Sequence, residues 1–298
     1  MDLVKKYAPE AAQLSIGQFC PPKCFELAGK TFTFRIDTGE ETGDYVLRFI
    51  DGTQLEWSAR GSEPKTETYE CRKSDDWTYL LSYNIDGKQP RENHTWVIDT
   101  EQELVTFLRC ALGENVFWPY LIDSHFGFGI ILEEGREHKD VRRHNFTEEV
   151  NGTCVRWHYG HSMSTIHVYY DSNWYRIAYP KNKVETGEMP DSTRKIREMM
   201  QSMPSNDEPA KYVKIKEGMY LVSVTEQNLE KLLGEQFGFR SDTLCFLDNW
   251  KRMYSVGRAF GTITTDGVDR EIFIPIGKYG APEECEERFM TDPVPYVV

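Results

Sequence analysis

The chain has 298 residues, of which 39% are hydrophobic and 13% aromatic, enough for one large packed domain or two ordinary ones. Its formal net charge of −13 argues against nucleic acid and anionic membranes as partners, because both require a basic surface. No apolar run approaches the ~18 residues of a membrane-spanning helix, and the residues after Met1 lack an apolar signal core, which predicts a cytoplasmic protein.

Residues 1–27 carry little strand pattern and are predicted to form an N-terminal arm. Dense alternation of apolar and polar residues follows, which is typical of half-buried β-strands. Asp51-Gly52, inside one alternating segment, is a strong hairpin signal. The predicted strands and hairpins occupy 29–36, 44–59, 67–85, 94–112 and 115–132. Residues 28–132 are therefore predicted to form one antiparallel domain.

The charged segment 133–149 is the predicted linker, and after it the pattern begins again. Residues 150–298 form the second predicted domain, with a helical insertion at 181–209 (helix over 192–203) and a C-terminal tail. Residues of the two halves match in order: Gly29 and Gly152, Phe34 and Trp157, Asp51 and Asp171, Tyr79 and Tyr220, Asp99 and Asp248. These ordered matches indicate an internal duplication.

An up-and-down antiparallel unit must bury its apolar face, and closing the sheet into a barrel does this while removing the exposed edges. The sequence thus predicts an all-β chain of two tandem lipocalin-like (calycin) barrels. Small barrels commonly hold one ligand, so a small molecule is the predicted partner, and a homodimer is also compatible with the sequence. Of the seven cysteines only Cys20 and Cys24 lie close together, in CPPKC. A half metal site and a redox pair are the alternatives for them, but no second ligand pair stands at zinc-like spacing and their spacing is not that of thioredoxin, which favours free thiols.

Glu226 is the main candidate for a catalytic residue. It ends the segment 219–226, in which Tyr220, Val222, Val224 and Glu226 share one face of a strand. Its counterpart in the first half is Ile85, so an acid stands where the duplicate is apolar. A carboxyl group in an apolar pocket has a raised pKa and suits general acid–base catalysis. The alternative is a strand end that faces solvent.

Two further residues of the second half are predicted to act with Glu226. Tyr159 is expected to hydrogen-bond a ligand, and His158 to shuttle protons at the pocket mouth. Arg176 is expected to pair with a ligand carboxylate. The other predicted substrate-binding residues are aromatic or imidazole side chains: Trp157, His167, Tyr169, Tyr170, Trp174 and Tyr220. Ordinary packing and cross-strand pairing are the alternatives for all of them.

A metal site is not predicted. His158, His161 and His167 lie within ten residues of one another, but strand alternation and the turn between them scatter their side chains. The chain also lacks a Gly-rich phosphate loop, a nucleophile elbow and a Rossmann turn, so no cofactor is predicted either.

The duplicated hairpins resemble the MoaF-like proteins, named for molybdenum cofactor biosynthesis protein F. The matching stretches are LEWSARG, LVSVTEQN and NWKRMYSVGRAFG, within residues 28–265. The resemblance implies an N-terminal and a C-terminal lipocalin-like half. It does not imply that the chain handles molybdopterin.

The second half also resembles the bacterial phenolic acid decarboxylases, which are single lipocalin-like barrels that work without a cofactor. Their catalytic Glu follows a strand like Ser223-Val224-Thr225, which places Glu226 in that role. Tyr159 matches the second tyrosine of their early Tyr-x-Tyr strand, while Trp157 replaces the first. Their arginine-bearing glycine-rich loop is replaced here by 181–209, which argues against decarboxylation specifically.

The function predicted from the sequence is a cofactor-free enzyme acting by acid–base chemistry on a small aromatic or carboxylated metabolite in the second barrel. A lyase (decarboxylase or hydratase) or an isomerase fits, because both reactions need only positioned proton transfer. One alternative is a non-catalytic carrier or sensor of a small hydrophobic ligand. Another is a scaffold whose acidic face binds a protein.

Overall fold

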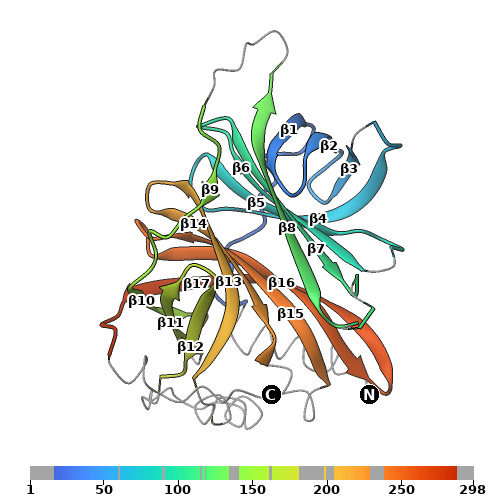
Figure 1. Ribbon diagram of the computed structural model, residues 1–298. Coiled ribbons are helices and arrows are strands. Elements are labelled where there is room, and N and C mark those ends of the chain that lie inside the picture. The colour runs from blue at the N-terminus through green and yellow to red at the C-terminus, as the bar shows by residue number, and fades with distance from the viewer. Residues whose placement is uncertain are drawn as a thin grey trace. The chain divides into compact units, whose positions relative to one another are not determined.

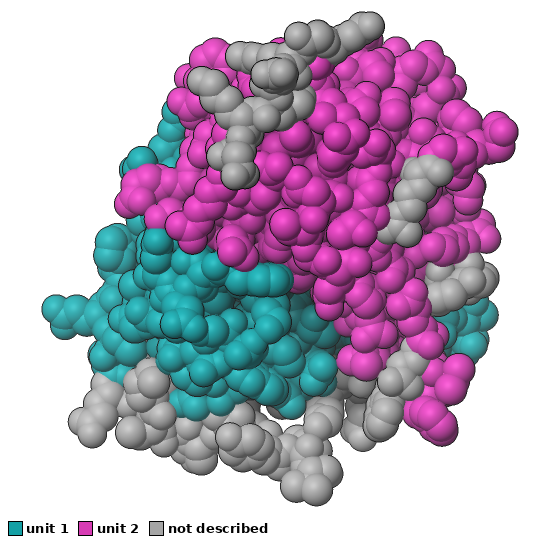
Figure 2. All heavy atoms as spheres, turned by 45° about the horizontal axis from the view of Figure 1, so that its top comes forward, with its two compact units in different colours: residues 1–20, 146–212, 218–298 teal, residues 21–145, 213–217 magenta. Residues whose placement is uncertain are grey.

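The computed structural model describes residues 17–59, 61–88, 91–114, 116–117, 119–133, 141–160, 163–180, 198, 205–228 and 238–286. These residues form β-strands and turns almost throughout (Figure 1). The chain divides into two compact units, residues 21–145 with 213–217, and residues 1–20 and 146–212 with 218–298 (Figure 2).

The strands are β1 (Thr31–Gly39), β2 (Gly43–Phe49), β3 (Gln54–Ala59), β4 (Lys65–Lys73), β5 (Thr78–Asn84), β6 (Glu92–Asp99), β7 (Leu104–Leu112), β8 (Ile122–Leu132), β9 (Asn145–Phe146), β10 (Thr153–His158), β11 (Ser164–Asp171), β12 (Trp174–Ala178), β13 (Asn206–Lys216), β14 (Met219–Glu226), β15 (Phe239–Asn249), β16 (Tyr254–Thr265) and β17 (Val268–Pro282).

The first barrel is a closed sheet of β1 to β8 in sequence order. β1 pairs with β2 on one side and with β8 on the other, which closes the sheet. Alternate side chains of each strand point inward and pack into one core. At its centre Trp96 stacks on Phe107 at 4.0 Å and on Phe34 at 5.3 Å between ring centroids.

The second barrel consists of β10 to β17. Its sheet has the order β12-β11-β10-β17-β16-β15-β14-β13-β9, and an additional pairing of β12 with β13 closes it. The inner face carries a core that includes Trp157, Tyr175 and Val222. Ile166 and Val168 belong to a separate cluster on the outer face. The predicted all-β fold of two tandem antiparallel barrels is confirmed.

Local backbone details repeat between the barrels. Gly29 and Gly152 have φ of 77° and 82°, and their amides donate to the carbonyl oxygens of Phe49 and Tyr169 respectively. In the turns β6–β7 and β15–β16, the non-glycine residues Glu103 and Met253 both adopt positive φ, at 58° and 46°. Left-handed non-glycine residues are uncommon, so their recurrence at one turn position supports the duplication.

The strand registers correct one match made from the sequence. Thr78 pairs with Asp99, and Met219, the equivalent of Thr78, pairs with Asn249. Asp99 and Asn249 also play the same role in their turns, each accepting a hydrogen bond from the backbone amide three residues later. Asp99 therefore corresponds to Asn249, and the match to Asp248 was wrong by one residue.

This one-residue correction moves Asp248 to the other face of its strand, because side chains alternate with period two. Asp248 corresponds to Ile98, which is part of the first core. By the same registers Asp242 corresponds to Glu92, and Glu226 corresponds to Ile85 as predicted. Asp248 is thus an interior residue and not a turn residue.

The predicted helix over 192–203 lies outside the described residues, apart from Glu198, which is helical. The end of the predicted insertion is wrong, because residues 206–209 are the start of β13. They form a strand because β12 needs a partner to close the barrel, and they pair with Trp174–Ile177. No helix in the described parts of the chain has the length and hydropathy of a membrane span. None of the seven cysteines, all of which are among the described residues, forms a disulfide.

Candidate functional site

A group of buried acids lies at one end of the second barrel. Glu226 ends β14 on the inner face, and its cross-strand partner on β15 is Asp242. Both side chains are 6% exposed, and their carboxyl groups are hydrogen-bonded to each other. Glu208 on β13 is fully buried close to the pair. The expectation that Glu226 lies on the apolar face of its strand is met, and Asp242 is a second acid that the sequence did not reveal.

Burial raises the pKa of all three carboxyl groups. Burial raises the pKa of Glu226 well above its usual range, and the neighbouring Asp242 carboxylate raises it further. The pKa of Asp242 is raised to about 7, again by burial, although the hydrogen bond with Glu226 opposes the change. Near neutral pH, Glu226 therefore holds a proton that it donates to Asp242. One buried acid and one buried base lie side by side, as in carboxylate dyads that share a proton.

Glu208 has a structural counterpart in the first barrel. Its carboxylate accepts hydrogen bonds from the backbone amides of Gln227 and Asn228. In the first barrel Glu67 accepts in the same way from the amide of Asp86. Because both copies keep this contact, we assign Glu208 to holding the strand end and not to a task specific to the second barrel.

Tyrosines line the barrel beside the acid pair. Burial, followed by the charge of Glu226, raises the pKa of Tyr175 and of Tyr179 far above 10, so both stay neutral. The buried hydroxyl of Tyr175 has no hydrogen-bond partner among the described residues, and neither has Oδ1 of Asp242. Unsatisfied buried polar atoms are uncommon in proteins. An unsatisfied donor and acceptor near one acid are what a bound polar ligand would satisfy.

A hydrogen-bonded chain of polar residues also lies in the interior of the second barrel. Tyr159 Oη lies 3.2 Å from His167 Nε2, and Tyr169 Oη lies 3.3 Å from His167 Nδ1. Tyr169 donates its only proton to Asp248 Oδ2 at 3.2 Å. His167 Nδ1 must therefore donate to Tyr169, which leaves Nε2 to accept from Tyr159. Lys278 Nζ completes the chain, 3.3 Å from Asp248 Oδ1.

Six of the predicted site residues thus lie inside the barrel: Glu226, Trp157, Tyr159, His167, Tyr169 and Tyr220. Trp157 donates from Nε1 to Tyr169 Oη at 3.2 Å. Tyr220 is more distant from the acids, and its hydroxyl donates to Glu149 Oε2.

The other four predicted site residues lie on the outer face of the sheet. Arg176 forms a two-pronged ion pair with Asp207 and lies over the ring of Tyr170. Tyr170 packs against the outer cluster, and Trp174 is 42% exposed. His158 follows the inward-facing Trp157, so alternation turns it outward. We therefore assign these four residues no role at the interior site.

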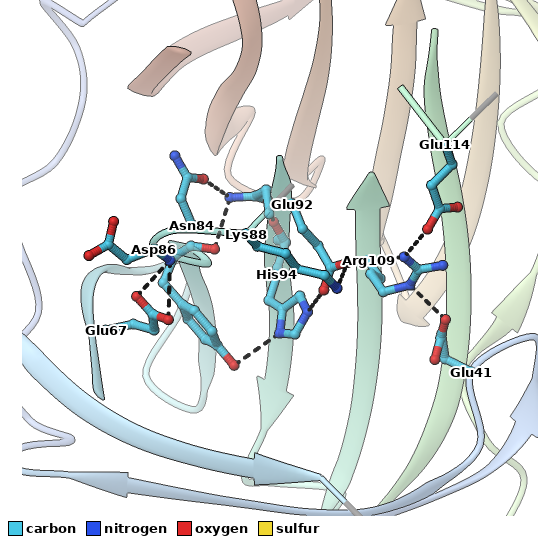
Figure 3. Close-up of polar contacts among 12 residues, drawn as sticks. Glu41, Glu67, Asn84, Asp86, Lys88, Glu92, His94, Arg109 and Glu114 are labelled. Atoms are coloured by element: carbon cyan, nitrogen blue, oxygen red, sulfur yellow. Dashed lines mark hydrogen bonds and ion pairs between the residues drawn. The ribbon is translucent and has the colours of Figure 1, made fainter. Parts of the chain in front are cut away.

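The equivalent end of the first barrel carries a different charged cluster (Figure 3). Glu92, the counterpart of Asp242, contacts His94 at 2.7 Å and Arg109 at 3.1 Å, and it forms an ion pair with Lys88. Burial opposes its ionisation, but the hydrogen bond from His94 and the Lys88 ammonium lower the pKa of Glu92 to about 2. Arg109 is further held by two carboxylates, of Glu41 and Glu114, both at 2.8 Å.

One comparison with known proteins bears on this first barrel. The family model of the MoaF N-terminal domain matches residues 10–114, a range that contains β1 to β7. Residues 10–114 are therefore similar to the MoaF N-terminal domain. The predicted resemblance is thereby confirmed for the first half, whereas the likeness of the second half to phenolic acid decarboxylases stays a prediction. No curated protein matches the chain.

Asp242, Asp248 and Lys278 are among the interior polar residues that the sequence did not reveal, and all three lie beyond the residues that match the MoaF N-terminal domain. Lys278 lies in a stretch treated as a C-terminal tail, but Ile272, Ile274, Ile276 and Lys278 alternate as a strand does. That alternation was the available signal. Asp242 could be found only from its pairing with Glu226, which is a long-range contact.

Proposed function

We propose that the second barrel catalyses a cofactor-independent lyase or isomerase step on a small aromatic or carboxylated metabolite. The observation that carries the proposal is the buried pair of Glu226 and Asp242, which holds one proton near neutral pH. Lyases and isomerases of this kind remove a proton at one atom and deliver one at another. A protonated and an ionised carboxyl group within one hydrogen bond provide both functions without a metal or an organic cofactor.

The surroundings support a role in chemistry beyond packing. In the proposed reaction Glu226 donates its proton to the substrate, and Asp242 accepts one. The Tyr175 hydroxyl donates a hydrogen bond to a carbonyl or carboxylate oxygen of the substrate. Because its pKa is raised, the hydroxyl keeps its proton at all physiological pH values. Tyr159 lies close enough to Glu226 for the two groups to influence each other electrostatically. The aromatic rings supply the flat apolar walls that an aromatic substrate needs.

The substitution Glu226→Gln tests the proposal. The protein and the variant are incubated with a small-molecule extract, and consumed compounds are identified by mass spectrometry. We expect turnover of the consumed compound to fall at least about 100-fold in the variant, the usual contribution of one proton-transfer group. Glu283→Gln, on the outer face in an ion pair with Arg156, is the matched control and should keep full activity.

A second function, non-catalytic binding of a small hydrophobic ligand, is supported by the aromatic lining alone. Under that function a compound co-purifies with the protein, no compound is consumed, and Tyr175→Phe weakens binding as much as Glu226→Gln does. Absence of any consumed compound, or full turnover by Glu226→Gln, contradicts the catalytic proposal.

A further inference from the structure

Lys278 occupies an unusual position for a lysine. It lies on β17 with its side chain inside the second barrel and is 0% exposed. Its ammonium nitrogen is 3.6 Å from the ring centroid of Phe246 and 4.2 Å from that of Trp157. Asp248 is its ion-pair partner, and Nζ makes no hydrogen bond that meets normal geometry among the described residues. Lysines are almost never fully buried, so this one requires an explanation.

The fold itself does not require a lysine here. β17 corresponds to β8, because Tyr254 pairs with Tyr279 as Leu104 pairs with Ile130. Lys278 therefore stands where the first barrel has Gly129, and Asp248 stands where it has Ile98. The first barrel closes and packs with neither charge.

The same contrast holds along the whole interior chain. Tyr169, His167 and Tyr159 correspond to Phe49, Leu47 and Ile36, as the registers of β10 and β11 show. Five hydrogen-bonding or charged residues thus replace four apolar residues and one glycine. Burying such groups costs several kcal/mol unless they are fully paired. Five linked replacements at a cost to stability indicate a function of the chain as a unit.

The surroundings favour the neutral form of the Lys278 amine. Burial lowers the pKa of Lys278 to about 8, although Asp248 opposes the change. A measurable fraction of the amine is therefore neutral near physiological pH. The titratable groups around it are Asp248 on β15, Tyr169 and His167 on β11 and Tyr159 directly after β10, all within the described interior. Desolvated lysines of this kind are suited to attack carbonyl groups.

We propose that Lys278 binds an aldehyde or ketone metabolite covalently as a Schiff base. This inference rests on the proposed function for the reaction that follows, and it specifies the substrate class as a small carbonyl compound. The neutral amine attacks the carbonyl carbon, a C–N bond forms, and the carbonyl π electrons move to oxygen. That oxygen takes a proton from the medium or the tyrosine–histidine chain, while nitrogen gives one to Asp248.

The carbinolamine hydroxyl then takes the proton back from Asp248 and leaves as water, which gives an iminium ion next to the restored Asp248 carboxylate. Amine, carbonyl compound and one proton are thus converted to an iminium ion and water, with no change of oxidation state. An iminium ion accepts the electron pair released when a neighbouring carboxylate or α-proton leaves. The Schiff base would therefore assist the same lyase or isomerase step for which Glu226 and Asp242 supply and accept protons.

Reductive trapping on the intact protein tests the proposal. The protein is incubated with 4-carboxybenzaldehyde and sodium cyanoborohydride, and labelled peptides are mapped by mass spectrometry. We expect one adduct per chain on Lys278, formed before the exposed lysines react. Lys278→Arg keeps the positive charge beside Asp248 and should remove this adduct. Lys211→Arg, an exposed lysine bonded to Asn173, is the matched control and should leave labelling of Lys278 unchanged.

Labelling of exposed lysines while Lys278 of the native protein stays unmodified overturns the proposal, and this measurement needs no variant to fold. The two proposals also fail separately. If Glu226→Gln abolishes turnover but Lys278→Arg retains it, the acid–base site stands and the Schiff base does not. If Lys278 is trapped but Glu226→Gln is fully active, the Schiff base stands and the role of Glu226 does not.

Discussion

The two barrels place acids at the same end of the same fold and shift the pKa values of those acids in opposite directions. In the first barrel Glu92 has His94, Lys88 and Arg109 as partners and a pKa of about 2. In the second barrel its counterpart Asp242 faces another acid, Glu226, and has a pKa of about 7. The fold position is shared, so the neighbouring side chains and not the architecture decide the charge.

The registers identify which replacements cause this difference. His94 and Arg109 of the first barrel correspond to Leu244 and Ala259 of the second. Ile85 corresponds to Glu226. Two interior cationic or polar groups are thus replaced by apolar ones, while an acid is added. A site of ionised, paired groups becomes a site that stores a proton, which is the property needed for acid–base work.

The largest effect is expected at the buried ion pair that only the second barrel has. Lys278→Met leaves Asp248 as an unpaired buried charge, which typically destabilises by about 3–5 kcal/mol. In a domain of this size that lowers the melting temperature by roughly 10 °C. Lys278→Met combined with Asp248→Leu should recover most of the loss, because the double variant approaches the Gly129 and Ile98 pattern of the first barrel.

The double-mutant cycle compares thermal unfolding of the unsubstituted protein, Lys278→Met, Asp248→Leu and the double variant. Hydrogen exchange of β15 and β17 assigns the change to the second barrel. A double variant no more stable than Lys278→Met would mean that the pair is needed for packing, and would remove the argument that the fold tolerates its absence.

A smaller effect, with a characteristic pH dependence, is expected for Glu92→Gln. The folded pKa of Glu92 lies below the ordinary value of 4.5. The ionised Glu92 carboxylate therefore contributes its full stabilisation of the folded protein above about pH 4.5, and this contribution is lost as the pH falls toward 2. The difference corresponds to roughly 3 kcal/mol at neutral pH. Urea unfolding at pH 7 and pH 3 should show a large loss in Glu92→Gln at the higher pH and a reduced one at the lower.

Two variants make this prediction specific to the first barrel. Glu114→Gln removes a half-exposed partner of the same Arg109 and should cost less than about 1 kcal/mol. Asp242→Asn should act with the opposite sign. Its folded pKa lies above the ordinary value of 3.8, so ionisation in the native protein costs stability as the pH rises from about 4 through 7. Asp242→Asn should flatten that decline, and equal pH profiles for both variants would contradict the comparison.

The sequence predicted the all-β fold, the duplication and the inward face of Glu226, because all three follow from alternation along single strands. It did not reveal Asp242 or Asp248, because their positions depend on how two strands pair. Matching Asp99 to Asp248 was wrong by one residue, and with a period of two that error exchanges the faces of a strand. Lys278 was missed for a different reason, since β17 was taken for a tail.

The outer-face residues illustrate a signal that was present but not used. Tyr169 and Tyr175 are inward, so the adjacent Tyr170, Trp174 and Arg176 had to be outward. Selecting residues by aromatic content joined both faces into one site. Alternation applied from one inward residue would have separated them.

The smallest effect is therefore expected for His158→Gln on the outer face. His158 on β10 and His167 on β11 are histidines of two paired strands. The His158 side chain faces outward, whereas the His167 side chain faces the barrel interior. His158→Gln should leave turnover within about twofold and stability within about 0.5 kcal/mol, as is usual for substitutions away from packed networks. His167→Gln is the matched inner variant. It breaks hydrogen bonds to Tyr159 and Tyr169 and should reduce both turnover and melting temperature. A tenfold loss of turnover in His158→Gln with an unchanged melting temperature would place the reaction on the outer face, where Arg176 and Tyr170 lie.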